Sequence, residues 1–155
     1  MSLVTLRLAA LSLLLAAGAC FAADVGPPAN DKLAGARSRI AEKNWTAAID
    51  ELKKVDDPAS ADWNNLMGYS LRKADPVANA EAAEKFYDAA LRIEPRHRGA
   101  LEYSGELYLM TGNLAKAEER LATLDKACFL PCEEYNDLKR AVARYKAAGN
   151  RYVAP

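Results

Sequence analysis

Two cysteines and one histidine are the side chains of this 155-residue chain with the greatest scope for chemistry. Cys128 and Cys132 stand in the stretch ACFLPCEEY, and His97 stands in PRHRGA. Catalysis by a histidine needs partners within hydrogen-bond reach, and no serine or cysteine motif accompanies His97. The spacing C-x-x-x-C also differs from the C-x-x-C of thioredoxin-like redox motifs. We therefore predict that the protein is not an enzyme and has no catalytic residues, no metal-binding residues and no cofactor. We expect His97 to be a solvated turn residue.

The first 22 residues have the pattern of a secretory signal peptide. A short segment with one cation precedes an apolar run, and small residues end it in MSLVTLRLAALSLLLAAGACFAA. The apolar run is shorter than the ~20 residues that a membrane-spanning helix needs, so we predict cleavage after Ala22 and export to the bacterial periplasm. Because Ala17 to Cys20 resembles the bacterial lipobox, a lipid anchor at Cys20 is the alternative. Residues 23–30, DVGPPAN included, are expected to form a flexible linker.

Export bears on the role of the two remaining cysteines. Disulfides form and persist in exported proteins, and residues four apart across a helix end can bring their Cα atoms within the ~4.4–6.8 Å that a disulfide accepts. A structural Cys128–Cys132 disulfide is the main prediction. Two alternatives stay open, namely reduced or buried thiols and a redox or metal role.

The charge balance argues against nucleic acid and anionic membranes as partners. The chain has 21 basic and 21 acidic residues, and the loss of Arg7 with the signal peptide would change this balance by one charge. No cluster of basic residues provides the electrostatic footprint that such partners require. We expect neither of these partners, and no membrane span in the mature chain.

The mature chain shows helical patterning throughout and no alternation typical of strands. Ala, Leu, Glu, Lys and Arg recur at helical spacing, with turn signals at short intervals. The fold class predicted from this pattern is all-α, in a single domain over residues 31–150. The pattern places seven helices at 31–42, 45–55, 60–73, 78–94, 97–110, 113–127 and 132–148.

The segments NNLMGYSL (64–71) and LEYSGELY (101–108) align, which places Gly68 on Gly105, 37 residues later. A helix-pair repeat of about 34 residues with three extra residues in the Asp75-Pro76-Val77 turn explains this period. The segments resemble tetratricopeptide repeats (TPRs). The positions that match the family pattern, most of them packing positions, are Gly68, Ala83, Tyr87, Ala90, Pro95, Gly105, Tyr108, Ala117 and Leu121, and a degenerate first copy places Ala36, Ala48 and Leu52 at equivalent positions.

The resemblance implies a right-handed α-solenoid of three repeats, at about 31–57, 60–95 and 97–127, with a capping helix at 132–148. A glycine inside a helix costs roughly 1 kcal/mol relative to alanine, so we expect a close helix crossing at each one. Gly68 should meet the helix that carries Ala83, and Gly105 the helix that carries Ala117. The capping helix should bury the stripe formed by Tyr135, Leu138, Val142 and Tyr145.

In the family, the first helix of each repeat lines a concave groove that binds partners. Carried over by position, the groove residues are Arg37, Asn65, Tyr69, Arg72, Lys73, Glu102, Glu106, Leu109 and Met110, and we expect them to be exposed and to add little to stability. A mixed groove of this kind suits a peptide or a helix of another protein. The predicted function is a non-catalytic interaction scaffold of the cell envelope. The alternatives are a thiol-redox or metal-handling accessory that uses Cys128 and Cys132, and a structural lipoprotein.

Overall fold

The computed structural model describes residues 31–130 and 132–154, and this part of the chain contains seven α-helices and no strand. The helices are α1 (Ala34–Ala41), α2 (Trp45–Val55), α3 (Ala61–Ala74), α4 (Ala80–Ile93), α5 (Arg98–Met110), α6 (Leu114–Ala127) and α7 (Glu133–Ala147). The all-α prediction is confirmed, and each predicted helix lies within three residues of the observed one at both ends. The predicted signal peptide, linker and lipid anchor at Cys20 lie outside the described residues.

Polar side chains fix the beginnings of several helices, as the turn signals indicate. Asn44 and Asn113 precede α2 and α6, and their side chains accept hydrogen bonds from the backbone N–H of Ala47 and Lys116. Such N-caps satisfy a donor that the first helical turn leaves free. Both asparagines therefore start the second helix of a pair in the same way, as expected for equivalent positions of a repeat.

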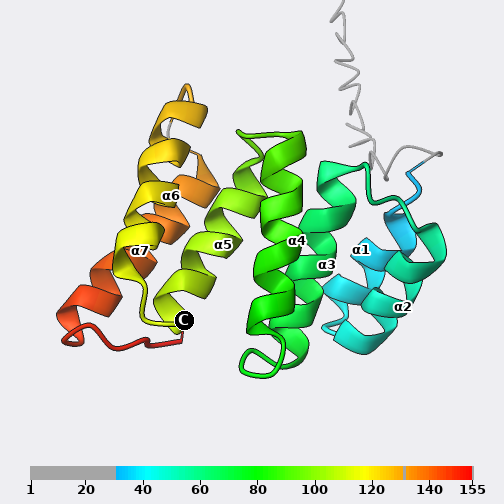
Figure 1. The fold of residues 1–155 in the computed structure, drawn as a ribbon, viewed down its shortest axis with the longest axis horizontal. Coiled ribbons are helices and arrows are strands. Elements are labelled where there is room, and N and C mark those ends of the chain that lie inside the picture. Colours follow the sequence, from blue (N-terminus) through cyan, green and yellow to red (C-terminus); the bar gives the residue numbers. More distant parts are fainter. Residues whose placement is uncertain (1–30, 131, 155) are drawn as a thin grey trace, which may run out of the picture.

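The helices form a row of packed pairs, α1 with α2, α3 with α4 and α5 with α6, and α7 closes the row against α5 and α6 (Figure 1). In addition, α1 contacts α3, α3 contacts α5, and α5 contacts α7. These four helices make one layer, here called the A layer, and α2, α4 and α6 make the second, the B layer. The architecture is solenoid-like, because each pair buries its apolar surface against its neighbours.

The small and aromatic residues of the repeat pattern fill the core. Ala48, Ala83, Ala117, Tyr87 and Ala90 have no exposed surface, and Ala36, Leu52 and Tyr108 are also buried. Leu121 is partly buried against the last of three apolar clusters. Pro95 does not pack in the core, in contrast to the prediction. It is exposed in the turn after α4, where its lack of a backbone N–H prevents continuation of the helix.

One of the two predicted glycine crossings is confirmed, and at the other glycine the nearest contact comes from a helix that was not predicted. A Cβ atom at Gly68 would lie 2.8 Å from Cε1 of Tyr87 and 3.1 Å from the carbonyl oxygen of Ala83, both on α4. At Gly105, however, the added atom would meet Cδ2 of Leu138 at 2.5 Å. The tightest contact at Gly105 is therefore with Leu138 on α7, because α5 packs between α6 and the capping helix.

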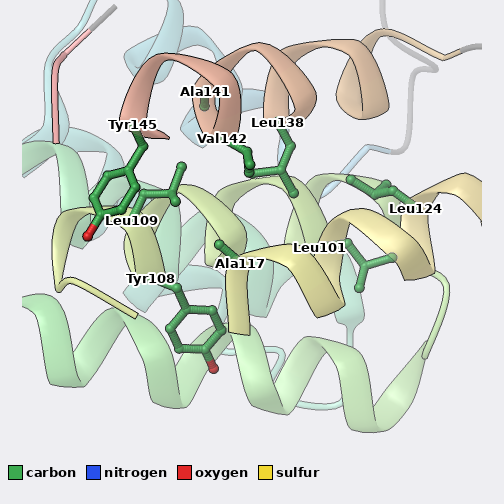
Figure 2. Close-up of a cluster of buried hydrophobic side chains, with 9 residues drawn as sticks. All are labelled: Leu101, Tyr108, Leu109, Ala117, Leu124, Leu138, Ala141, Val142 and Tyr145. Atoms are coloured by element: carbon green, nitrogen blue, oxygen red, sulfur yellow. The ribbon is translucent and has the colours of Figure 1, made fainter. Parts of the chain in front are cut away.

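The capping helix buries the stripe expected from its sequence. Leu138, Val142 and Tyr145 are buried, and Tyr135 packs partly buried against the same cluster. Figure 2 shows the side chains of α7 extending toward those of α5 and α6. The cluster comprises Leu101, Tyr108, Leu109, Ala117, Leu124, Leu138, Ala141, Val142 and Tyr145. Among the described residues, none of the helices combines the length and apolar character needed to cross a membrane.

Candidate functional site

Three aromatic rings from α2, α3 and α5 follow one another beside two cations. The ring centroids of Trp45 and Tyr69 lie 6.0 Å apart, and those of Tyr69 and Tyr103 lie 4.6 Å apart. Lys73 Nζ lies 5.9 Å from the Trp45 centroid and 5.8 Å from the Tyr69 centroid. The Arg72 guanidinium lies 5.7 Å from the Tyr69 centroid and 5.6 Å from that of Tyr103. We call these five residues the aromatic strip.

Helix geometry explains how the strip is assembled. Tyr69, Arg72 and Lys73 are spaced i, i+3 and i+4, which places them on one face of α3. Tyr103 lies on α5, the neighbour of α3 in the A layer, and Trp45 is the first residue of α2. Cations placed over aromatic rings at these distances are attracted by the ring quadrupole. The strip is thus a preformed row of three contacting rings, with Lys73 exposed beside it and Arg72 buried against it.

One member of the strip, Arg72, takes part in a buried ion pair that joins α3 to α5. Arg72 Nη1 lies 2.8 Å from Glu106 Oε2, with 4% of the Arg72 side chain and 17% of the Glu106 side chain exposed. Arg72 Nη1 also lies 3.8 Å from the Met110 sulfur. Because both charges are largely withdrawn from water, removal of either partner would leave the other charge buried and unpaired, at a large cost in the free energy of unfolding. Arg72 and Glu106 therefore form the floor of the site rather than an exposed contact surface.

The predicted groove residues differ widely in exposure. Arg37 and Lys73 are exposed, Tyr69, Glu106 and Met110 are half-buried, and Asn65, Arg72, Glu102 and Leu109 are buried. Leu109, at 1% exposure, belongs to the core under α7, so its assignment to the groove is wrong. The expectation of general exposure fails because the A-layer helices pack against one another and α7 covers part of α5.

Glu102 is the clearest departure from an exposed groove. Its residue exposure is 8%, and burial raises the pKa of its carboxyl to about 8, an effect strengthened by Glu106, Asp137 and Glu134 and opposed by Arg72. The carboxyl is therefore largely protonated in the folded protein at neutral pH. The expectation that Glu102 lies exposed in a groove is therefore wrong.

This raised pKa predicts a pH dependence of stability. Between the ordinary value of 4.5 and about 8, the unfolded chain releases the Glu102 proton whereas the folded chain keeps it, so the free energy of unfolding falls as the pH rises through this window. The substitution Glu102→Gln should remove this part of the slope. Urea denaturation from pH 5 to 9 measures it, with Glu119→Gln on the exposed side of α6 as the control. If the difference in the free energy of unfolding between the wild type and Glu102→Gln stays constant with pH, the raised pKa of Glu102 is contradicted.

His97 is a structural residue and not the solvated turn residue that we predicted. Its Nδ1 accepts a hydrogen bond of 3.1 Å from the backbone N–H of Ala100, and its Nε2 lies 2.9 Å from Oδ1 of Asp62. Only 11% of its side chain is exposed. The ring caps α5 and ties its first turn to the first turn of α3.

A cavity of about 380 Å³ opens at one end of the aromatic strip. Its lining consists of Trp45, Arg72, Lys73, Pro76, Met110, Tyr152 and Ala154. Sequence reasoning missed Trp45, Tyr103 and Tyr152. For Tyr103 the signal was its position three residues before Glu106 on the same helix face. Tyr152 lies beyond the predicted end of the domain at residue 150 and had no counterpart in the repeat pattern.

The predicted disulfide is present. Cys128 and Cys132 are joined, with their Cα atoms 5.9 Å apart, across the turn between α6 and α7. The turn exposes Phe129 completely and leaves Leu130 at 72% exposure. The bond therefore fixes the connection through which the capping helix reaches α5 and α6.

Replacing both cysteines with serine should lower the free energy of unfolding by about 2 kcal/mol, the chain-entropy value for so short a loop. Denaturation of the wild type and of the double variant, both without reductant, measures this loss. A strong reductant should reproduce this loss in the wild type, whereas a mild thiol should leave the disulfide intact. A pair that cycles readily in a glutathione buffer with no change in stability would instead favour the thiol-redox alternative.

A scan against protein-family models and a search of curated proteins found no match to this chain. Function is therefore inferred from the geometry of the chain itself. The site offers three contacting aromatic rings, one exposed ammonium group and an open cavity beside an ion-paired floor. These features can hold an extended chain or a helix face by apolar contact and charge, and they place no nucleophile next to a base.

Proposed function

We propose that this chain is a TPR protein of the bacterial cell envelope that binds a peptide or helix of another protein on the aromatic strip, without catalysing a reaction. One observation carries the proposal: three half-buried aromatic rings, on α2, α3 and α5, contact one another beside the exposed Lys73 and lead into the 380 Å³ cavity. Tyrosine, tryptophan and arginine are the residues that most often dominate the energetics of protein interfaces.

The electrostatics of the strip favour a partner segment with a carboxylate. Lys73 is exposed, lies between the rings of Trp45 and Tyr69, and has no ion-pair partner among the described residues. Arg72, in contrast, is already paired with Glu106. A carboxylate that approaches the strip would therefore find one available ammonium group, flanked by aromatic surface.

The packing of the helix pairs supports the family assignment. Gly68 approaches α4 at Ala83 and Tyr87, and the equivalent asparagines Asn44 and Asn113 cap α2 and α6. An open array of such pairs offers one face of its first helices to a ligand, as repeat proteins do. The periplasmic location rests on the signal-peptide pattern of residues 1–22. The mass of the mature N-terminus distinguishes cleavage after Ala22 from lipid attachment at Cys20.

The double substitution Tyr69→Ala with Lys73→Ala should weaken partner capture at least tenfold while the fold and its stability stay close to wild type. Loss of an aromatic hot spot costs ~2 kcal/mol or more, which corresponds to roughly 30-fold in affinity. The measurement is quantitative capture from an envelope extract, with circular dichroism and urea denaturation of each variant. Glu106 is left unchanged because its removal would strand the buried Arg72.

The matched control is Glu81→Ala with Lys85→Ala, an exposed ion pair on α4 in the B layer. Capture by this variant should equal that of the wild type. Capture that survives the strip variant but disappears when Cys128 and Cys132 are replaced would assign the binding role to the disulfide turn instead.

A further inference from the structure

The chain does not end at α7 but turns back toward the candidate site. Gly149 and Asn150 both have positive φ, of 68° and 60°, and the backbone N–H of Asn150 donates to the carbonyl of Tyr145. This turn ends α7 and reverses the chain. The following residues run back toward α5, where the C-terminal end lies (Figure 1).

One side chain anchors this tail. Tyr152 is half-buried and packs against the apolar cluster of α5, α6 and α7. It lines the same cavity as Arg72, the buried cation of the ion-paired floor. Burial raises the pKa of its phenol, and Glu106 adds to this effect while Arg72 opposes it. Tyr152 and Ala154 then line the cavity together with Trp45, Lys73 and Met110.

The rest of the tail is weakly held. Over residues 151–154 no backbone hydrogen bond is formed within the described chain, and Val153 is 48% exposed. Segments that lack backbone hydrogen bonds and have few buried contacts open at low free-energy cost. The tail can therefore leave the site without unfolding the helices.

We propose that the C-terminal segment from Asn150 to Ala154 is an intramolecular ligand of the surface around Arg72 and Met110, where it forms one wall of the cavity beside the aromatic strip. A partner segment of the same chemistry, an aromatic side chain followed by small apolar residues in an extended chain, displaces it. This inference rests on the proposed function, since it concerns the regulation of that site. It makes the tail a competitor whose release precedes or accompanies binding.

Tethering makes such a weak contact effective. A short flexible connection gives an effective concentration in the millimolar range. A free peptide that binds the surface under the tail with a dissociation constant near ~0.1 mM would therefore bind about tenfold more weakly while the tail is in place. The same argument predicts that removing the tail, or only its anchor, increases the apparent affinity for a competing peptide.

The experiment uses a fluorescein-labelled synthetic peptide with the sequence of residues 150–155, NRYVAP, as the probe. Fluorescence anisotropy compares the mature chain, a chain that ends at Gly149, and the mature chain with Tyr152→Ala. We expect the two altered chains to bind the probe about tenfold more tightly than the wild type. Met110→Glu in the shortened chain, which puts a charge into the cavity wall, should reduce probe binding at least tenfold.

A second probe with alanine in place of the tyrosine should bind at least tenfold more weakly to both altered chains. Tyr152→Ala removes the anchor without shortening the chain, so it tests the inference even if the shortened chain folds poorly. Circular dichroism checks that each chain is folded. Equal probe binding by all three chains, or equal binding of both probes, would overturn the inference. The two proposals can also fail separately. If the probe binds as expected but the Tyr69 and Lys73 substitutions leave partner capture unchanged, the tail does cover this surface and only the proposed function is contradicted.

Discussion

Glu106→Ala is expected to be among the most destabilising single substitutions in this chain, with a loss of about 3–5 kcal/mol in the free energy of unfolding. The substitution removes the partner of Arg72, whose side chain is 4% exposed and lies 2.8 Å from the Glu106 carboxylate. A guanidinium left buried without its counter-charge keeps its desolvation penalty and loses the compensating attraction. Chemical denaturation at neutral pH measures the loss.

The control for this prediction removes both charges together. Arg72→Met with Glu106→Leu replaces the pair by apolar side chains of similar size, which is often neutral or stabilising for a buried ion pair. The double variant should therefore be more stable than Glu106→Ala alone. A Glu106→Ala protein within 0.5 kcal/mol of wild type would show that the pair is well solvated, which would contradict its burial.

Gly105→Leu should cost several kcal/mol by overpacking, since even a single Cβ atom at this position would lie 2.5 Å from Cδ2 of Leu138. Leu138 has no exposed surface, so it cannot turn aside without disturbing the interface between α5 and α7. Overpacked cores typically lose 1–3 kcal/mol and occasionally more. Thermal or urea denaturation measures the effect.

Two further variants test the cause of this loss. Leu138→Ala added to Gly105→Leu should recover part of the stability, because residues in contact give non-additive effects. Gly35→Ala in α1 is the matched control, since its Cβ atom would meet Glu51 Oε2 at 3.4 Å, an ordinary contact. It should be neutral or stabilising by up to about 1 kcal/mol through helix propensity. Equal losses for Gly105→Leu with and without Leu138→Ala would contradict the contact between α5 and α7.

The helices and much of the core could be predicted from sequence because local signals agree with the global packing. Asn44, Ser60 and Asn113 stand at helix starts, and their side chains accept hydrogen bonds from backbone N–H groups of the first turn. The period that aligns Gly68 with Gly105 also identified buried small positions such as Ala83 and Ala117. These features depend on the helix period and on pairs of adjacent helices, both of which a repeat pattern specifies.

The features that sequence reasoning missed depend on contacts outside the repeat. The cap α7 decides the surroundings of Gly105 and Leu109, and no repeat position describes how a cap docks. Glu102 is buried by packing between A-layer helices, and His97 is held by Asp62, which lies 35 residues away. Tyr152 reaches the site from a tail beyond the repeats. Long-range placement of this kind has no local signature in the sequence.

Site-specific photo-crosslinking tests most directly where the partner binds. A photo-crosslinking amino acid is placed at position 69, at position 85 on the B layer, or at position 129 in the disulfide turn, and each protein is irradiated in the cells that produce it. The account predicts a covalent adduct with one partner protein from position 69 and none from positions 85 and 129. Adducts from position 129 or 85 with none from position 69 would contradict the claim that the aromatic strip is the binding surface.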